Sequence, residues 1–283
     1  MKSCLAALLC VLPWTTPTPA QSESPPAVDA PAKLAEWPTL DAPTKDRVLA
    51  LFGQFKKPAE ELRTAAAKDL LGIGAGAAPL LFQQVSDREP NQNDQLFAVF
   101  DAMLDRTHAA LMAREVQKPR AELRRYLIRR LCTFADPDVL AVLQATTKDK
   151  DALTAFYAWL GMLALKQKEA VAPVLAYTRT NWREVGEFAA VVLPAARSPE
   201  AGQWLWDAIA TASPADQMTG LRLLRYLAPK EQASNLRTYL QSKDNVVLKE
   251  AINTARVLHG ERPVENLPVF QVVEMSKQWL QKL

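Results

Sequence analysis

A repeat of about 31 residues runs from residue 44 to the end of the chain, and it constrains the fold more than any other feature. Within each repeat, apolar residues recur at intervals of three and four, which is the pattern of an amphipathic helix. A shift of 61 positions places Glu61-Leu62-Arg63 on Glu122-Leu123-Arg124, and a shift of 186 positions places Arg63 on Lys249. A single helix pair cannot bury its own apolar stripe, so we expect successive pairs to stack around one continuous core.

Each repeat is broken near its middle by residues that favour helix ends and helix starts. Glycine tolerates the positive φ of a helix end, and a Ser or Asp followed by Pro is typical of a first helical turn. We therefore predict two helices in each repeat, and six to seven helix pairs between residues 44 and 283. The predicted breaks are residues 72–76, 136–138, 166–168, 198–200 and 228–230.

The most regular repeat spans residues 58–87. It carries Arg63 and a run of small residues, turns at Gly72–Gly74, and continues with Ala78-Pro79-Leu80-Leu81 and Ser86-Asp87. An arginine and small residues, a glycine turn, a Pro-Leu pair and a closing acid follow one another in the HEAT family. In this order of residues the segment resembles a HEAT repeat.

Two further segments, residues 119–148 and 244–260, resemble a HEAT repeat more weakly. Tetratricopeptide repeats are the alternative helical pair, and Trp159-Leu160-Gly161 is similar to their opening, but their later Ala and Pro positions do not follow. The resemblance to HEAT repeats implies an all-α fold, a right-handed α-α superhelix of an exported bacterial type. Residues 262–283 are expected to form a C-terminal helix that caps the array.

The N-terminal residues predict export. Lys2 precedes a short apolar run, Cys4–Leu12, and a small residue ends the polar stretch that follows. The run is too short to span a bilayer, which needs about 20 apolar residues. We therefore predict a signal peptide over residues 1–20, no membrane span after its removal, and a location in the periplasm or at the cell surface. An uncleaved membrane anchor is the alternative.

Residues 21–43 contain five prolines, which fix φ and remove hydrogen-bond donors. They are expected to form a Pro-rich disordered tether, with Trp37 and Leu40 touching the first helices. If the signal is removed, Cys132 is the only cysteine left, so no intramolecular disulfide is expected. Its apolar neighbours predict that Cys132 packs in the core.

The sequence contains no recognised motif for catalysis or metal binding. Only two histidines occur, and neither HExxH nor a paired-cysteine spacing is present. Asp101, Asp105 and His108 would share one face of a helix, where they could hold a divalent metal; a solvated surface is the alternative that we favour. We therefore expect no metal, no cofactor and no enzymatic activity.

A net charge of only +3 is unlike the strongly basic balance of a dedicated nucleic-acid-binding protein. The run from Arg120 to Arg130 is the segment best suited to phosphates, but Glu122 interrupts it. Arg124 falls on the apolar side of its helix, and we expect it to pair with the backbone or an acid of a neighbouring repeat. We therefore expect no nucleic-acid partner.

In the predicted second helices, polar residues come shortly after the core positions in sequence. Together these residues form a polar row along the array. In HEAT-like solenoids these helices line the concave side, so the row is expected to face a groove there. Amides and hydroxyls suit hydrogen bonding to an extended partner, whereas an ordinary solvated face is the alternative for each residue. Trp206 occupies a core position and is a candidate for a binding hot spot. The predicted binding residues are Gln83, Gln144, Asp207, Thr238 and Trp206.

These features together predict a non-catalytic scaffold that binds a protein or peptide along its concave face, because repeat arrays offer extended surfaces. Two alternatives stay open. One is an enzyme or accessory lyase whose site is dispersed over several helices. The other is a helical repeat that binds nucleic acid.

Overall fold

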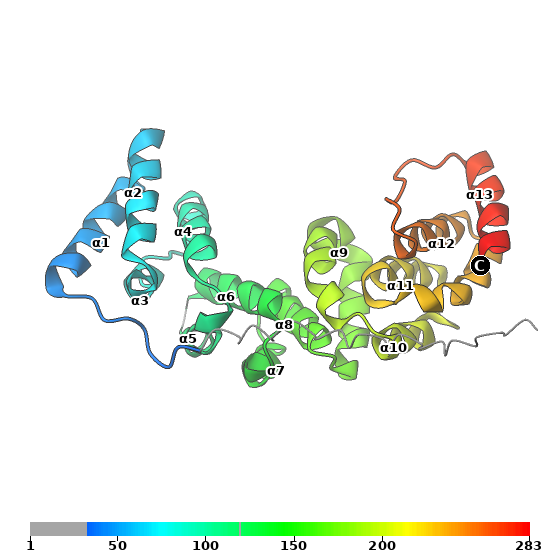
Figure 1. Ribbon diagram of the computed structural model, residues 1–283, viewed down its shortest axis with the longest axis horizontal. Coiled ribbons are helices and arrows are strands. Elements are labelled where there is room, and N and C mark those ends of the chain that lie inside the picture. Colours follow the sequence, from blue (N-terminus) through cyan, green and yellow to red (C-terminus); the bar gives the residue numbers. More distant parts are fainter. Residues whose placement is uncertain (1–32, 119) are drawn as a thin grey trace, which may run out of the picture. The chain divides into compact units, whose positions relative to one another are not determined.

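The computed structural model describes residues 33–118 and 120–283. The predicted signal peptide, residues 1–20, and residues 21–32 of the predicted tether lie outside the described residues. Every regular element in the described part of the chain is helical, and the helices follow one another as stacked pairs (Figure 1). The prediction of an all-α, HEAT-like solenoid is therefore confirmed.

The pairs consist of a longer first helix and a second helix that is usually shorter. Helix α1 (Ala42–Gln54) precedes them and packs on α2. The first helices are α2 (Glu60–Ile73), α4 (Pro90–Met103), α6 (Ala121–Phe134), α8 (Ala152–Ala164), α11 (Pro214–Leu227) and α12 (Asn245–Leu258). The second helices are α3 (Ala78–Phe82), α5 (Ala109–Glu115), α7 (Leu140–Thr146), α10 (Pro199–Ile209) and α13 (Val269–Lys282).

Short 3-10 helices connect or replace parts of these pairs. Four of them lead into second helices; η2, η3 and η4 each follow an extended residue, and η1 follows Gly74, which has a positive φ. After α11, two 3-10 helices stand in place of a regular second helix. The 3-10 helices are η1 (Ala75–Ala77), η2 (Arg106–His108), η3 (Pro137–Val139), η4 (Lys168–Ala170), η5 (Leu193–Ala196), η6 (Lys230–Arg237) and η7 (Tyr239–Gln241).

Each predicted break coincides with a helix end in the structure. Gly74 has a φ of 82° and Lys166 a φ of 59°, both in the left-handed region. The Asp136 carboxylate accepts a hydrogen bond from the Asp138 amide at the start of η3. Ser198 caps α10 in the same way, as expected for small polar residues at helix starts.

Helix α9 (Val171–Val192) departs from the predicted pattern because it serves two consecutive pairs. Asn181 in its middle has non-helical dihedrals, φ −119° and ψ 20°, and bends the helix. The Asn181 side-chain amide donates to the Tyr177 carbonyl at 2.9 Å and stabilises the bend. The half before Asn181 is a second helix, and the half after it is the first helix of the next pair.

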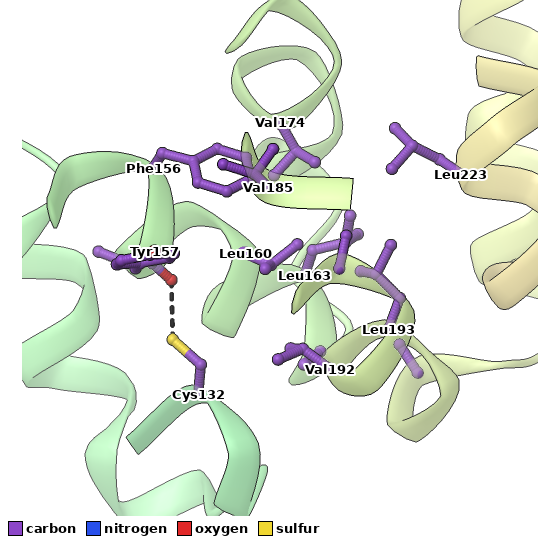
Figure 2. Close-up of a cluster of buried hydrophobic side chains, with 14 of the residues drawn as sticks. Cys132, Phe156, Tyr157, Leu160, Leu163, Val174, Val185, Val192, Leu193 and Leu223 are labelled. Carbon is purple, nitrogen blue, oxygen red and sulfur yellow. Dashed lines mark hydrogen bonds between the residues drawn. The ribbon is translucent and has the colours of Figure 1, made fainter. Parts of the chain in front are cut away.

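One buried apolar cluster runs through the stacked pairs. Figure 2 shows its central part, where side chains of α6, α8 and α9 meet. The Cys132 thiol donates to the Tyr157 carbonyl at 2.8 Å, and Cys132 is only 1% exposed. Burial raises the pKa of this thiol. The expectation that Cys132 packs in the core is therefore confirmed.

Residues 33–41, which we call the strap, lie in the predicted tether and pack along three consecutive pairs. Lys33 forms an ion pair with Asp136 at 2.9 Å. The Leu34 amide donates to the Thr107 carbonyl at 3.0 Å. Trp37 contacts Phe82 and stacks on His108 at 5.9 Å, and Pro38 and Leu40 cover Gly76 so closely that a Cβ there would lie 2.8 Å from a backbone oxygen.

Among the described residues, no single helix is long and apolar enough to cross a membrane. The segments Glu60–Ile73 and Ala75–Phe82 reach that length and composition together, across a bend of 105°.

Candidate ligand-binding site

The predicted polar row is exposed but its members lie on separate elements. Gln83 follows α3, Gln144 lies on α7, Asp207 on α10, and Thr238 between η6 and η7. In the described part of the chain no hydrogen bond joins two of them. Asp207 lines a cavity of about 670 Å³ between η4 and α10, and its carboxylate accepts a hydrogen bond from Gln203 at 2.7 Å.

Trp206 is 5% exposed and its ring lies 5.8 Å from that of Tyr239. The structure therefore places Trp206 in the core, where a ligand does not reach it. The tryptophan that lines the cavity beside Asp207 is Trp204.

Asp101, Asp105 and His108 do not converge. Helix α4 ends at Met103, so Asp101 lies on a different element from the other two. Asp105 caps η2, with its carboxylate 2.8 Å from His108 Nδ1. No group of three or more His, Cys, Asp or Glu side chains within the described ranges is arranged to hold a metal.

Most of the basic run is engaged by the protein itself. Arg124 pairs with Asp149 and Arg125 with Asp151, which confirms the expectation that Arg124 reaches an acid of the next repeat. Arg120 donates to the Phe82 carbonyl at 2.7 Å. Arg130 donates to the carbonyls of Asp101 and Leu104 at 2.9 and 2.8 Å. The Arg129 side chain is exposed and forms no hydrogen bond or ion pair with any residue that the structure describes.

Arg129 lines a cavity of about 190 Å³ at the junction of α4, α6 and α9, which we call the α4–α6–α9 cavity. Its wall combines charged, aromatic and aliphatic side chains from these three helices. The lining residues are Asp101, Tyr126, Arg129, Arg130, Thr133, Phe188 and Val191.

The α4 and α6 sides of this cavity are held together by hydrogen bonds. The Tyr126 hydroxyl donates to the Asp101 carboxylate at 3.0 Å. Burial, followed by the charge of Asp101, raises the pKa of Tyr126 well above its usual value, so the hydroxyl keeps its proton. Arg130 Nε lies 3.6 Å from the same carboxylate, too far for a hydrogen bond but close enough for attraction.

Arg129 is positioned by an aromatic ring instead of an acid. Its guanidinium carbon lies 4.9 Å from the centre of the Phe188 ring, which is cation–π geometry. Phe188 in turn rests edge-on against Tyr157 of α8 at 5.1 Å. The guanidinium is therefore held in place while its hydrogen-bond donors stay available to a ligand.

Arg129, Phe188 and Tyr126 were not among the predicted binding residues. Phe188 is almost two repeats from Arg129 in sequence, and it lies on the half of α9 after the bend at Asn181, which contacts α6. A sequence signal for Arg129 did exist. Arg124 and Arg125 have acids 25 and 26 residues later, whereas positions 154 and 155 are Thr and Ala, so Arg129 has no corresponding partner.

No protein-family model matches the chain, and no curated protein sequence matches it. Among solved structures, the chain is similar to human deoxyhypusine hydroxylase in complex with glycerol. The two share 17% sequence identity with a TM-score of 0.34, over 85% of this chain and 98% of the hydroxylase chain.

This finding corrects two predictions. The chain was expected to be a non-catalytic scaffold without enzymatic activity, whereas the solved structure that it resembles is that of an enzyme. The physical reason is that a missing sequence motif excludes only sites built from neighbouring residues, and a solenoid brings together side chains from distant helices.

Proposed function

We propose that this protein binds a small organic carboxylate in the α4–α6–α9 cavity. The observation that carries the proposal is Arg129, which lines the cavity and whose guanidinium has no hydrogen-bond or ion-pair partner among the described residues. Guanidinium donors form paired, charge-assisted hydrogen bonds with carboxylates, each worth about 1.5–3 kcal/mol. Stacking on Phe188 limits the side-chain freedom that binding would otherwise cost.

The rest of the cavity favours an organic ligand over an inorganic anion. Phe188 offers a half-buried aromatic face, and Val191 is 68% exposed, which is high for a large apolar side chain. The Asp101 carboxylate would repel a doubly charged anion such as phosphate. At about 190 Å³ the cavity is smaller than the roughly 300–1,000 Å³ of sites for drug-sized ligands, so the ligand is small.

Isothermal titration of the full chain with 4-methylpentanoate, 3-phenylpropanoate and inorganic phosphate tests this function. The wild-type protein is expected to bind one or both organic acids more tightly than phosphate. Arg129→Gln should weaken that binding by about tenfold or more, because it removes the charge but keeps a polar side chain. Arg88→Gln, which removes an exposed arginine outside the cavity, is the matched control and should bind like the wild type.

Failure of every organic carboxylate tested to bind, with or without an amino group, or equal binding by wild type and Arg129→Gln, would contradict the proposal. Tighter binding of phosphate would instead identify a simple anion site. The same samples, followed by proton NMR after prolonged incubation, report whether a bound acid is converted into a new compound. Such conversion would support the dispersed-site enzyme.

We also propose that the protein acts outside the cytoplasm, in the periplasm or at the cell surface. The support is the order of Lys2, the apolar run Cys4–Leu12 and the small residue Ala20. Expression of the full chain in a bacterial host, followed by fractionation and intact-mass measurement, should yield a periplasmic product that begins at Gln21. A full-length product in the cytoplasmic fraction would rule this location out.

A further inference from the structure

The α4–α6–α9 cavity contains a negative group as well as a positive one. The Asp101 side chain is 50% exposed and borders the same space as Arg129, from a different helix. Its hydrogen bond from Tyr126, at 3.0 Å, fixes the carboxylate in place. An ionised carboxylate can accept about four hydrogen bonds, so most of its acceptor capacity is unused by the described residues.

An exposed carboxylate beside a bound anion would weaken binding through repulsion. Arg130 offsets part of that charge, but its Nε lies 3.6 Å away and its Nη2 is directed to two backbone carbonyls. The repulsion disappears if the ligand itself brings a cationic group to Asp101. The cavity then offers one partner for each end of a zwitterion.

We propose that the ligand of the α4–α6–α9 cavity is a small free amino acid, with its carboxylate on Arg129 and its ammonium group on Asp101. This inference rests on the proposed function, since it assigns the second polar group of the same ligand. Phe188 and Val191 supply the apolar surface for the carbon chain between or beside the two charges. Both poles are fixed by neighbours before binding, Arg129 by Phe188 and Asp101 by Tyr126.

Matched pairs of ligands separate the ammonium contribution from the rest. L-Leucine is compared with 4-methylpentanoate, which lacks only the amino group, and 5-aminopentanoate is compared with pentanoate. In L-leucine the ammonium and carboxylate groups are close together, whereas in 5-aminopentanoate they stand at opposite ends of the carbon chain. At least one amino compound is expected to bind the full chain about three- to tenfold more tightly than its deamino partner, as for a partly exposed ion pair.

Asp101→Asn tests whether Asp101 is responsible for the preference for amino compounds. Asparagine keeps the size of the side chain and an acceptor for the Tyr126 hydroxyl, so the wall should stay in place. The variant should lose the preference for the amino compound while it binds the deamino acid as tightly as before, or more tightly. Asp94→Asn, on the same helix but outside the cavity lining, should leave both affinities unchanged.

The outcomes distinguish this inference from the function on which it rests. If neither amino compounds nor simple carboxylates bind, the proposed function fails as well. If the deamino acids bind as tightly as the amino acids, only the inference fails. An equal loss of both kinds of ligand in Asp101→Asn would also overturn it, because Asp101 would then act only on the cavity wall.

Discussion

At the scale of single residues, the packing of α6 against α8 depends on the glycine at position 161. A Cβ added there would lie 2.8 Å from the Cys132 sulfur and 3.0 Å from a methyl carbon of Leu143. Both neighbours are buried and short or branched, so neither side chain can move away without disturbing the core. The close approach of the two helices therefore requires a residue without a side chain.

Gly161→Ala is expected to lower the free energy of unfolding by about 1–3 kcal/mol, as overpacking of a core usually does. Urea unfolding followed by circular dichroism measures the effect. Gly72→Ala is the matched control, because no heavy atom lies within 4 Å of its added Cβ; it should stabilise α2 by about 0.5–1 kcal/mol. Adding Cys132→Ala to Gly161→Ala should recover part of the loss. If Gly161→Ala alone is neutral, the two helices pack less closely than described.

At the scale of elements, the strap joins the starts of three second helices. Its contacts run from Lys33 at η3, through Leu34 at η2, to Trp37 against α3 and His108. The strap has few backbone hydrogen bonds of its own, so its order depends on these side chains. Among them, the Trp37 ring contacts two aromatic rings, those of Phe82 and His108.

Trp37→Ala should detach the strap without unfolding the solenoid. Hydrogen exchange measured by mass spectrometry is expected to show lost protection at the Leu34 amide, whose bond to Thr107 depends on the strap staying in place. Exchange in α11 and α12 should be unchanged. Glu36→Ala, an exposed strap residue, is the control and should behave like the wild type. Unchanged protection of Leu34 in Trp37→Ala would mean that the other strap contacts suffice.

At the scale of the whole molecule, ion pairs connect neighbouring helices and the loops beside them along the array. Because each pair of helices contacts mainly its neighbours, such links contribute to the stability of the array as a whole. The connecting pairs are Arg47–Asp69, Arg124–Asp149, Arg125–Asp151 and Arg222–Glu250, with Arg225 as a second partner of Glu250.

Acid should weaken this connection between α6 and α8. Burial acts to raise the pKa of Asp149 and Asp151, but hydrogen bonds from Arg124, Arg125 and backbone amides outweigh it and hold both pKa values below the usual range. A carboxyl group with a lowered folded-state pKa stabilises the fold above its unfolded pKa, about 3.9, and loses that contribution as the pH falls through the folded value. Thermal stability should therefore be level from about pH 7 to 5 and fall below about pH 4.

Asp151→Asn identifies the contribution of one pair. Its melting temperature should be lower than that of the wild type at pH 7, and the difference should shrink toward pH 3, where the wild-type carboxyl group is becoming protonated. Differential scanning calorimetry at the two pH values measures both. A difference that stays constant with pH would show that Asp151 stabilises the fold through its shape and not through its charge.

The helix boundaries could be predicted from the sequence because the forces that set them are local. Gly74, Asp136 and Ser198 end or begin helices through their own backbone freedom or their own side-chain hydrogen bonds. The burial of Trp206 followed from periodicity for the same reason, since a helix places every third or fourth residue on one face. The all-α solenoid was determined by the sequence at this level.

The candidate site was decided by the tertiary structure. Arg125 and Arg129 belong to one basic run, yet Arg125 forms an ion pair with Asp151, whereas Arg129 stacks on the Phe188 ring and has no ion-pair partner among the described residues. That difference depends on how α8 and the bent α9 lie against α6, which local periodicity does not specify. The sequence by itself determined which segments are helical and which faces are buried. Only the packing of distant helices decided which charged groups pair with each other and which have no charged partner among the described residues.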